Sequence, residues 1–301
     1  MFKKFRFIGL ALALVLSVGL AACGNSGGSS NGQLGQSEIT IPYVSWAGAI
    51  ASSHVAGALL EKAGYEVSLK QVGAGEMFSS VASGSADALT AAWLPVTHQK
   101  YWKEYGDKLE KLQKTIDKAP LGLTVPKYMK INSIKDLKGN TKLGKKLDWT
   151  ITGIDPGAGE MAATKKVLKK YGLDKWKLQA SSGPAMTAAL KRAEDNHKPI
   201  IVTLWKPHWA FATWDLKILK DPKKVYGTAD SIYTVGRKDL KKDAPAAYKI
   251  LSQFNWNYDQ MGKVMKMDHN GVDPKKAAQK FLKKHPDLVK KWMKGVKTSK
   301  K

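Results

Sequence analysis

Two segments of this 301-residue chain, Ala92-Trp93-Leu94-Pro95-Val96-Thr97-His98 and Leu204-Trp205-Lys206-Pro207-His208-Trp209, echo each other. Each follows an apolar run, Ala86–Ala92 or Ile200–Leu204, that predicts a buried strand. In each segment a Trp ends the run and stands two residues before a Pro, which breaks further regular structure. We therefore expect both indoles at the rim of a sheet, facing a cleft, rather than inside a core.

The echo belongs to a longer internal repeat. Each copy predicts a strand, a helix, a Gly, a second strand, a second helix and the strand that delivers the echoed Trp. The first four elements span 39–44, 49–63, 65–71 and 76–83 in one copy, and 149–154, 161–171, 175–180 and 184–193 in the other. Gly64 and Gly172 stand where glycine relieves left-handed strain at a helix end. Strands alternating with helices indicate parallel β-α-β units, whose ligands bind beyond the carboxyl ends of the strands.

The order of these units predicts an α/β chain with two lobes. Residues 38–120 form the first segment of lobe I, 121–230 form lobe II, and 231–297 return to lobe I, mainly as helices, before a tail at 298–301. We expect Leu121–Pro126 and Ser231–Arg237 to be crossover strands between the lobes. The predicted architecture is two parallel-rich sheets flanked by helices, with a ligand cleft between the lobes.

The N-terminus predicts export. Residues 1–22 combine a basic start, an apolar stretch and small residues before Cys23, which is the pattern of a signal peptide. Leu20-Ala21-Ala22-Cys23 also resembles a bacterial lipobox, and Cys23 is the only cysteine, so no disulfide can form within the chain. Residues 23–37, rich in Gly, Ser and Asn, predict a flexible tether.

The chain is strongly basic, with 50 Lys and Arg against 25 Asp and Glu and a formal net charge of +25. Such a charge favours nucleic acid as a partner. The export signal argues against that partner, and the lysines are spread over many segments. We therefore interpret them as solvated faces near an anionic cell envelope, and expect no nucleic-acid partner.

No motif points to catalysis or to a metal. The chain has no Gly-x-Ser-x-Gly, His-Glu-x-x-His, paired Cys or phosphate-loop Gly-Lys-Ser, and no two of its six histidines have metal-ligand spacing. We therefore expect no catalytic residue, no metal and no cofactor. Only His98 receives a binding role, because it lies five residues past Trp93 on the same predicted loop.

A third Trp, Trp46, closes the first predicted strand. Aromatic faces attract a quaternary ammonium group, which has no N–H to offer to a hydrogen-bond acceptor. Gly153–Met161 is a Gly-rich turn leading from a strand into a helix, and the free amides at a helix start favour anions. The amides of Gly159 and Glu160, together with His98, would hold a carboxylate. These residues describe a site for a small zwitterion.

At these positions the chain resembles the glycine-betaine-binding proteins of bacterial osmoprotectant ABC importers, of the type that Gram-positive bacteria carry as lipoproteins. The resemblance covers nearly the whole mature chain. It rests on Tyr43-Val44-Ser45-Trp46, Gly84-Ser85-Ala86-Asp87-Ala88, Ala92-Trp93-Leu94-Pro95 with Thr97-His98, Gly153-Ile154-Asp155-Pro156-Gly157 and Trp205-Lys206-Pro207-His208-Trp209.

This resemblance implies the two-lobed class II solute-binding fold. It also implies a prism of three indoles around the trimethylammonium group, and a carboxylate held by one His and two amides. The matching residues are Trp46, Trp93 and Trp205 for the prism, and His98, Gly159 and Glu160 for the carboxylate. Further implications are a lipid on Cys23, an extracellular location at the cell membrane, and delivery of the ligand to a permease driven by an ATPase.

The chain departs from the family pattern at two places. Relatives carry Ile or another apolar residue in place of Glu160, and they often have an acidic residue after the Trp that matches Trp46, where this chain has Ala47. Since the expected contact at position 160 is a backbone amide, we expect its role to survive. The change after Trp46 leaves the prism intact and bears on affinity.

The function expected from these observations is the capture of glycine betaine, and also of proline betaine, by a lipid-anchored receptor of an ABC importer. A receptor of the same class for choline or carnitine is the nearest alternative. A secreted enzyme acting on a betaine or choline ester would need a nucleophile with a base, or a metal set. A basic lipoprotein that binds wall polymers would not need the three tryptophans.

Overall fold

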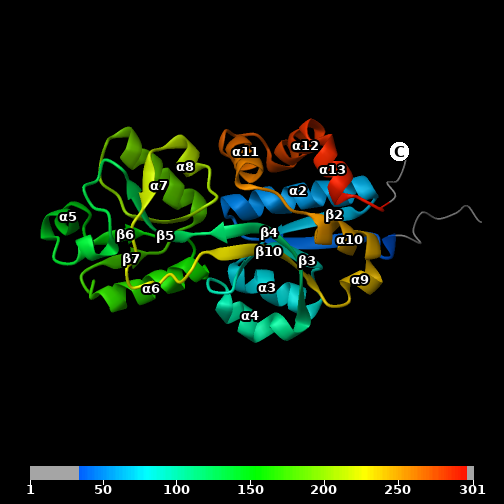
Figure 1. Ribbon diagram of the computed structural model, residues 1–301, viewed down its shortest axis with the longest axis horizontal. Coiled ribbons are helices and arrows are strands. Elements are labelled where there is room, and N and C mark those ends of the chain that lie inside the picture. Colours follow the sequence, from blue (N-terminus) through cyan, green and yellow to red (C-terminus); the bar gives the residue numbers. More distant parts are fainter. Residues whose placement is uncertain (1–33, 297–301) are drawn as a thin grey trace, which may run out of the picture.

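The computed structural model describes residues 34–296 and shows two α/β lobes placed end to end along its long axis (Figure 1). The two-lobed fold expected from the sequence is confirmed. The predicted signal peptide 1–22, the lipid site Cys23 and the tail 298–301 lie outside the described residues. Within residues 34–296, no helix has both the length and the apolar character needed to cross a membrane.

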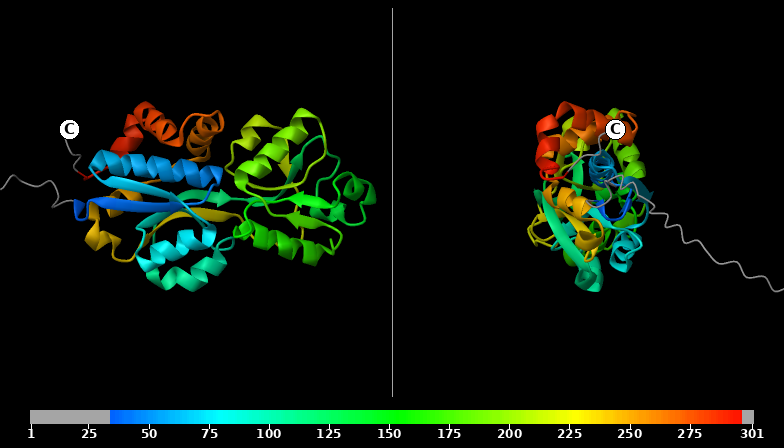
Figure 2. Two further views of the ribbon diagram at one scale, coloured as in Figure 1. Left: turned by 180° about the vertical axis from the view of Figure 1, so that it is seen from behind. Right: turned by 90° about the vertical axis from the view of Figure 1, so that its right-hand side faces the viewer.

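Lobe I is built on five strands. They are β1 (Glu38–Tyr43), β2 (Glu66–Gln71), β3 (Ala88–Leu94), β4 (Leu109–Ala119) and β10 (Asp230–Arg237). Strands β1 and β2 pair in parallel, whereas β10 lies between β3 and β4 and is antiparallel to both. Figures 1 and 2 show helix α2 (Ala47–Ala63) on one side of these strands, with α11 (Tyr258–His269) and α12 (Pro274–Lys284) above it, farther from the strands. Helices α3 (Ala74–Ser83) and α4 (Gln99–Tyr105) lie on the other side.

Lobe II has one five-stranded sheet in the order β7-β6-β8-β5-β9. Its strands are β5 (Leu121–Pro126), β6 (Thr150–Thr152), β7 (Lys177–Gln179), β8 (Val202–Trp205) and β9 (Leu216–Ile218). Helix α6 (Gly159–Tyr171) lies on one side of the sheet, and α7 (Gly183–Asp195) and α8 (Ala210–Thr213) lie on the other (Figure 1). The remaining helices are α5 (Thr141–Lys146), α9 (Leu240–Asp243), α10 (Pro245–Gln253), α13 (Pro286–Trp292) and the 3-10 helices Gly106–Lys108 and Ile134–Leu137.

Local sequence signals explain where the repeated helices end. Gly64 after α2 and Gly172 after α6 have φ angles of 107° and 62°, in the left-handed region that favours glycine. Buried apolar residues form two clusters, one of which fills the outer part of lobe II around Ile151 and Val167. The other fills lobe I and continues into lobe II through residues that include Trp205.

The sheets are mixed, and the expectation that they are parallel-rich is wrong. The parallel pairs are β1–β2, β6–β7 and β6–β8, whereas β3–β10, β4–β10, β5–β8 and β5–β9 are antiparallel. Strands β5 and β10 enter their sheets directly after the chain changes lobes, and they reverse direction there. The sequence led us to expect that both strands cross between the lobes, but each pairs only within one lobe. The crossings are the short stretches 119–121 and 227–229.

The sequence does not predict strand β4 (Leu109–Ala119), because its lysines indicate a solvated face. Its pairing with β10 shifts register at three places, so its buried residues do not alternate regularly along the strand. Leu109, Ile116 and Ala119 are nevertheless buried. The lysines between them are exposed, so the sequence does not show the strict alternation of apolar and polar residues that is typical of a strand.

The last residues of the predicted tether pack onto lobe I instead of being flexible. Leu34 is buried and its carbonyl accepts a hydrogen bond from the Tyr65 hydroxyl at 2.7 Å. The Gln36 side chain donates to Asp87 at 2.9 Å and accepts from Arg237 at 3.0 Å. These partners lie far away in the sequence, so local composition could not reveal them.

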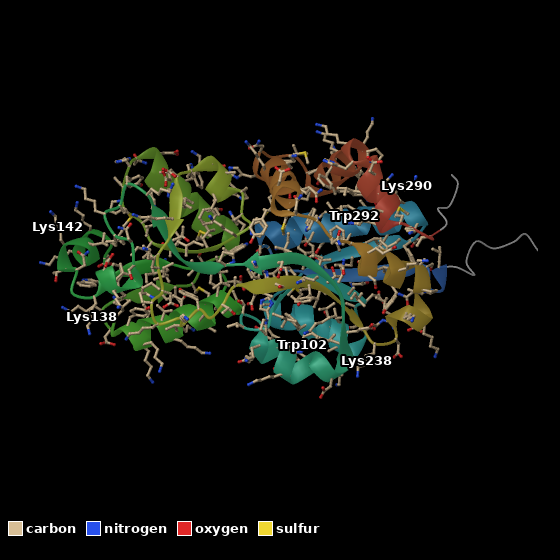
Figure 3. The ribbon with its side chains drawn as sticks, viewed as in Figure 1. Trp102, Lys138, Lys142, Lys238, Lys290 and Trp292 are labelled. Atoms are coloured by element: carbon tan, nitrogen blue, oxygen red, sulfur yellow. The ribbon has the colours of Figure 1, made fainter. Side chains whose placement is uncertain are left out.

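Exposed lysines cover both ends of the molecule. Figure 3 shows Lys138 and Lys142 pointing outward at the far end of lobe II, and Lys238 and Lys290 pointing outward from lobe I. All four are exposed, which agrees with the interpretation of the lysines as solvated faces. Trp292, by contrast, is fully buried among the C-terminal helices.

Candidate functional site

A cavity lies between the lobes, and the structure brings all six predicted binding residues to its wall. They are Trp46, Trp93, His98, Gly159, Glu160 and Trp205. The cavity leaves about 30 Å³ for the centres of water-sized spheres. By the same measure a single water molecule needs about 10–15 Å³. The cavity therefore suits a compact small molecule rather than a peptide or a sugar chain.

The three indoles reach the cavity from both lobes. Trp46 follows β1 and stands at the start of α2, Trp93 lies near the end of β3, and Trp205 ends β8 of lobe II. Their exposed fractions are 6%, 8% and 6%, so the closed lobes bury faces that the sequence placed at an open rim. The two echoed segments also share a backbone feature, because the Leu94–Pro95 and Lys206–Pro207 peptide bonds are both cis.

Trp46 is held by a residue of the opposite lobe. Its indole Nε1–H donates to Oδ2 of Asp155 at 2.6 Å, across the cleft. Burial raises the pKa of Asp155, and the hydrogen bond from Trp46 opposes that rise. A second bond across the cleft runs from the Tyr101 hydroxyl to the carbonyl of Gly157 at 2.8 Å. Both bonds exist only while the lobes are together.

His98 presents one defined donor. Its Nδ1 accepts the backbone N–H of Trp93 at 3.0 Å, and burial lowers the pKa of His98 to about 3. The ring is therefore neutral at ordinary pH, with its proton on Nε2. The loop before it is held by Asp230, whose carboxylate accepts the N–H groups of Val96 and Thr97 at 2.8 and 2.7 Å. This arrangement leaves Nε2–H as the donor for an anion.

The start of α6 supplies the other donors. Its N-cap residue, Ala158, has no side chain that could satisfy the first amides of the helix. At Gly159 the two lobes meet so closely that a Cβ would lie 2.0 Å from the carbonyl oxygen of Thr97. Only glycine permits this approach, which brings free amides of lobe II beside the His98 loop of lobe I.

Glu160 brings a carboxyl group to the same helix start. The residue is 3% exposed, and neither carboxyl oxygen has a hydrogen-bond partner among the described residues. Burial raises the pKa of Glu160 to about 8. The amides of Gly122 and Leu204 lie near enough to oppose this rise, although not in hydrogen-bond geometry.

The arrangement can bind a small molecule but offers no reactive group. The hydroxyls of Ser52 and Thr90 line the cavity and hydrogen-bond to each other at 2.8 Å rather than to His98. Among residues 34–296, no group of His, Cys, Asp and Glu could hold a metal ion. His208, to which the sequence assigned no ligand role, is buried outside this cavity, and its Nδ1 accepts the N–H of Ala210 at 3.1 Å.

Sequence reasoning missed three residues that position the site: Tyr101, Asp155 and Asp230. Asp155 stands inside the Gly-rich turn that the sequence singled out, but nothing local shows that its partner is an indole 109 residues away. Asp230 lies at the second crossing, next to the predicted strand 231–237. Its two bonds to the loop of β3 depend on the antiparallel entry of β10, which was not foreseen.

An aromatic cavity between two α/β lobes, lined also by a neutral histidine and the start of a helix, is typical of a solute-binding protein. The family model described as the substrate-binding domain of the ABC-type glycine betaine transport system matches residues 37–284, and the chain belongs to this family. The family consists of transport substrate-binding proteins and not of enzymes, so the sequence-based assignment to this class is confirmed.

Known relatives differ in ligand. The glycine betaine/carnitine transport binding protein GbuC of Listeria monocytogenes is 51% identical over 156 residues, which are 51% of this chain. The match spans 52% of GbuC, about half the length of that relative. Lactococcal OpuAC, in its closed complex with glycine betaine, is 41% identical with a TM-score of 0.80, covering 86% of this chain and 100% of that one.

Two further structures have the same TM-score of 0.80. The glycine betaine/L-proline-binding protein ProX of Borrelia burgdorferi is 33% identical and covers 85% of this chain and 96% of its own. A choline-binding protein in complex with choline is 25% identical and covers 87% of this chain and 93% of its own.

Proposed function

We propose that this chain is the extracellular substrate-binding lipoprotein of an ABC importer, and that it captures glycine betaine and proline betaine for osmoprotection. The observation that carries the proposal is the cavity between the lobes, which Trp46, Trp93 and Trp205 line together with His98 and Gly159. Support also comes from the family model and from the similarity to OpuAC in its glycine betaine complex.

The chemistry of the cavity favours a zwitterion. A quaternary ammonium is attracted to each indole face by roughly 0.5–2 kcal/mol. A carboxylate on the same ligand would accept hydrogen bonds from Nε2–H of His98 and from the amides that open α6. Choline has no carboxylate and would leave these donors without a partner. Carnitine has a longer chain, which the small cavity disfavours.

Calorimetric titration of the chain from residue 24 onward with glycine betaine tests this proposal. Wild type, Trp93→Ala and Trp205→Ala are compared, with Trp102→Ala as the matched control. Trp102 is a half-buried indole on α4 outside the cavity. We expect one ligand per chain, at least about tenfold weaker binding in Trp93→Ala and Trp205→Ala, and an unchanged affinity in the control.

Titration at two salt concentrations separates this function from wall-polymer binding. Glycine betaine carries no net charge, so its affinity should change little with salt, whereas binding of a basic surface to an anionic polymer weakens steeply. Absence of heat with glycine betaine, proline betaine, choline and carnitine would overturn the receptor proposal. Circular dichroism of each variant verifies that it is folded.

The proposal includes a lipid on Cys23 and delivery of the ligand to a permease driven by an ATPase. Cys23→Ala should release the chain from the membrane fraction into the medium, measured by immunoblotting of cell fractions. It should leave the affinity of the purified chain unchanged, since the cavity lies in residues 46–261. Retention in the membrane fraction of a Cys23→Ala chain from which residues 1–22 have been removed would exclude a lipid anchor at this position.

A further inference from the structure

Glu160 places an ionisable carboxyl group at the end of the cavity where the donors for a carboxylate lie. It is the second residue of α6, it lines the cavity, and it is 3% exposed. Neither of its carboxyl oxygens has a hydrogen-bond partner among the described residues. A carboxylate without a partner in such a place is costly, so burial favours the neutral acid and makes ionisation harder.

The groups around Glu160 do not supply a compensating positive charge. From the stretch before β10, the Tyr226 hydroxyl lies near it and hydrogen-bonds to Thr164 at 2.8 Å. Burial and the nearby Glu160 raise the pKa of Tyr226 well above its ordinary value, so it stays neutral. Beyond Tyr226 lies Asp221, whose carboxylate accepts the Tyr226 N–H at 2.8 Å.

The other elements around the cavity add no cation either. His98 is neutral, and Asp155, which follows β6, is itself an acid bonded to Trp46. Strands β5 and β8 offer Glu160 only backbone groups. Lys206, the next residue after Trp205, places its Nζ over the Phe211 ring at 4.5 Å instead.

From this placement, and resting on the proposed function, we propose that Glu160 selects between ligands by its protonation: the neutral acid admits a zwitterion with a carboxylate, and the ionised form favours a pure cation such as choline. The ligand carboxylate would lie at the same helix start as the Glu160 carboxyl group, and two like charges so close together repel each other. Choline has a positive charge and no negative one, so the ionised side chain attracts it.

The direction of the pH dependence follows from linkage. In the closed structure, burial raises the pKa of Glu160 to about 8. A bound carboxylate raises it further, so zwitterion binding takes up protons and its affinity falls as pH rises through 8, by at most tenfold per pH unit. A bound cation lowers it, so choline binding releases protons and its affinity rises in the same window. His98 and Tyr226 do not titrate there.

The test is calorimetric titration of the chain from residue 24 onward with glycine betaine and with choline at pH 6.5, 7.5, 8.5 and 9.5. We expect the ratio of betaine to choline affinity to fall at least fivefold between pH 6.5 and 9.5 in the wild type. The ratio should be constant in Glu160→Gln, whose amide cannot ionise. Titration of glycine betaine at pH 8.5 in two buffers of different ionisation enthalpy should show net proton uptake by the wild type and none by Glu160→Gln.

Asp268→Asn is the control, because burial also raises the pKa of Asp268, to about 7, and this residue lines a separate cleft on the other side of Trp205. It should keep the wild-type dependence on pH. A constant affinity ratio in the wild type, or the same pH dependence in Glu160→Gln, would overturn the inference while betaine binding itself stood. Absence of binding by both ligands at every pH would overturn the proposed function and this inference with it.

Discussion

At Gly159, closure of the lobes depends on the absence of a side chain. A methyl group there would meet the Thr97 carbonyl oxygen of the opposite lobe at 2.0 Å, and this oxygen belongs to backbone that Asp230 holds in place. At Gly183, at the start of α7, a Cβ would lie 2.9 Å from the Ser45 carbonyl oxygen, which is also too close but by less. Glycine thus occurs at these two points, where α6 and α7 of lobe II meet the backbone of lobe I.

Gly159→Ala should therefore weaken binding of glycine betaine at least about tenfold while leaving the thermal midpoint of the free chain nearly unchanged, because the clash arises only between the lobes. Isothermal calorimetry and differential scanning fluorimetry measure the two quantities. Gly262→Ala on α11 is the control, since no other atom would lie within 4 Å of the added Cβ. It should keep the affinity and stabilise the helix by roughly 0.5–1 kcal/mol. Equal affinity in both variants would contradict this account of closure.

The buried histidines predict how stability depends on pH. Burial lowers the pKa of His98 and of His208 to about 3, whereas an unfolded histidine titrates near 6.5. Between these values the unfolded chain binds more protons, so the free energy of unfolding is highest above pH 6.5 and falls as pH drops toward 3. Each histidine contributes up to about 1.4 kcal/mol per pH unit.

His208→Asn tests this contribution without changing a cavity residue. Urea denaturation at pH 6.5, 5.5 and 4.5 should show a slope of unfolding free energy against pH that is lower than in the wild type by about one proton. An unchanged slope would mean that His208 is protonated in the folded chain. His98 remains in that variant and keeps its own share of the acid sensitivity.

Among the secondary-structure elements, the contact between β10 and the loop after β3 matters most for the site. The Asp230 carboxylate accepts two amides of that loop and is itself 2% exposed. It thereby fixes the backbone that leads to His98. The second crossing between the lobes also ends at Asp230. The same residue therefore links the movement of the lobes to the position of His98.

Asp230→Asn should cost about 1–3 kcal/mol of unfolding free energy, because an amide cannot accept both N–H groups and its own N–H₂ faces a donor. Affinity for glycine betaine should fall as the His98 loop loosens. Asp117→Asn is the control: Asp117 is exposed on β4, and its main partner is the Ser231 hydroxyl at 2.7 Å. Urea denaturation compares the two, and equal stability of both variants would show that the loop does not depend on Asp230.

The sequence predicted the repeated strand–helix units well, because each carries its own apolar pattern and its own terminal glycine. It also predicted which residues line the cavity, since the strand ends of β-α-β units meet at one edge of a sheet. It failed for β4, whose irregular register conceals the pattern, and for the antiparallel entry of β5 and β10. Asp155 and Asp230 escaped notice because hydrogen bonds between distant segments leave no local signal.

For the molecule as a whole, contacts across the cleft set the balance between open and closed forms. Besides the bonds to Asp155 and Gly157, His269 of α11 stacks on Trp209 of lobe II with ring centroids 3.4 Å apart and planes at 13°. This pair lies outside the cavity, beside the separate cleft that Asp268 lines. It can favour closure without contacting a ligand.

His269→Ala should weaken glycine betaine binding roughly two- to tenfold, which corresponds to the loss of one aromatic pair of about 0.5–1.5 kcal/mol. Small-angle X-ray scattering of the unliganded variant should show a larger radius of gyration than the wild type. His285→Ala removes a similar stack, on Phe281, that lies wholly within lobe I. If His285→Ala opened the molecule as much as His269→Ala, the stack across the cleft would have no special role.

The burial of the cavity between the lobes also affects how long a bound molecule stays there. Trp46, Trp93 and Trp205 are each at most 8% exposed, so separation of the lobes is the expected route by which a molecule bound between them would leave. On that route, the dwell time would depend on how often the two short crossings at 119–121 and 227–229 let the lobes move apart. Substitutions at the crossings could lengthen or shorten that dwell time without altering any atom that the captured molecule touches.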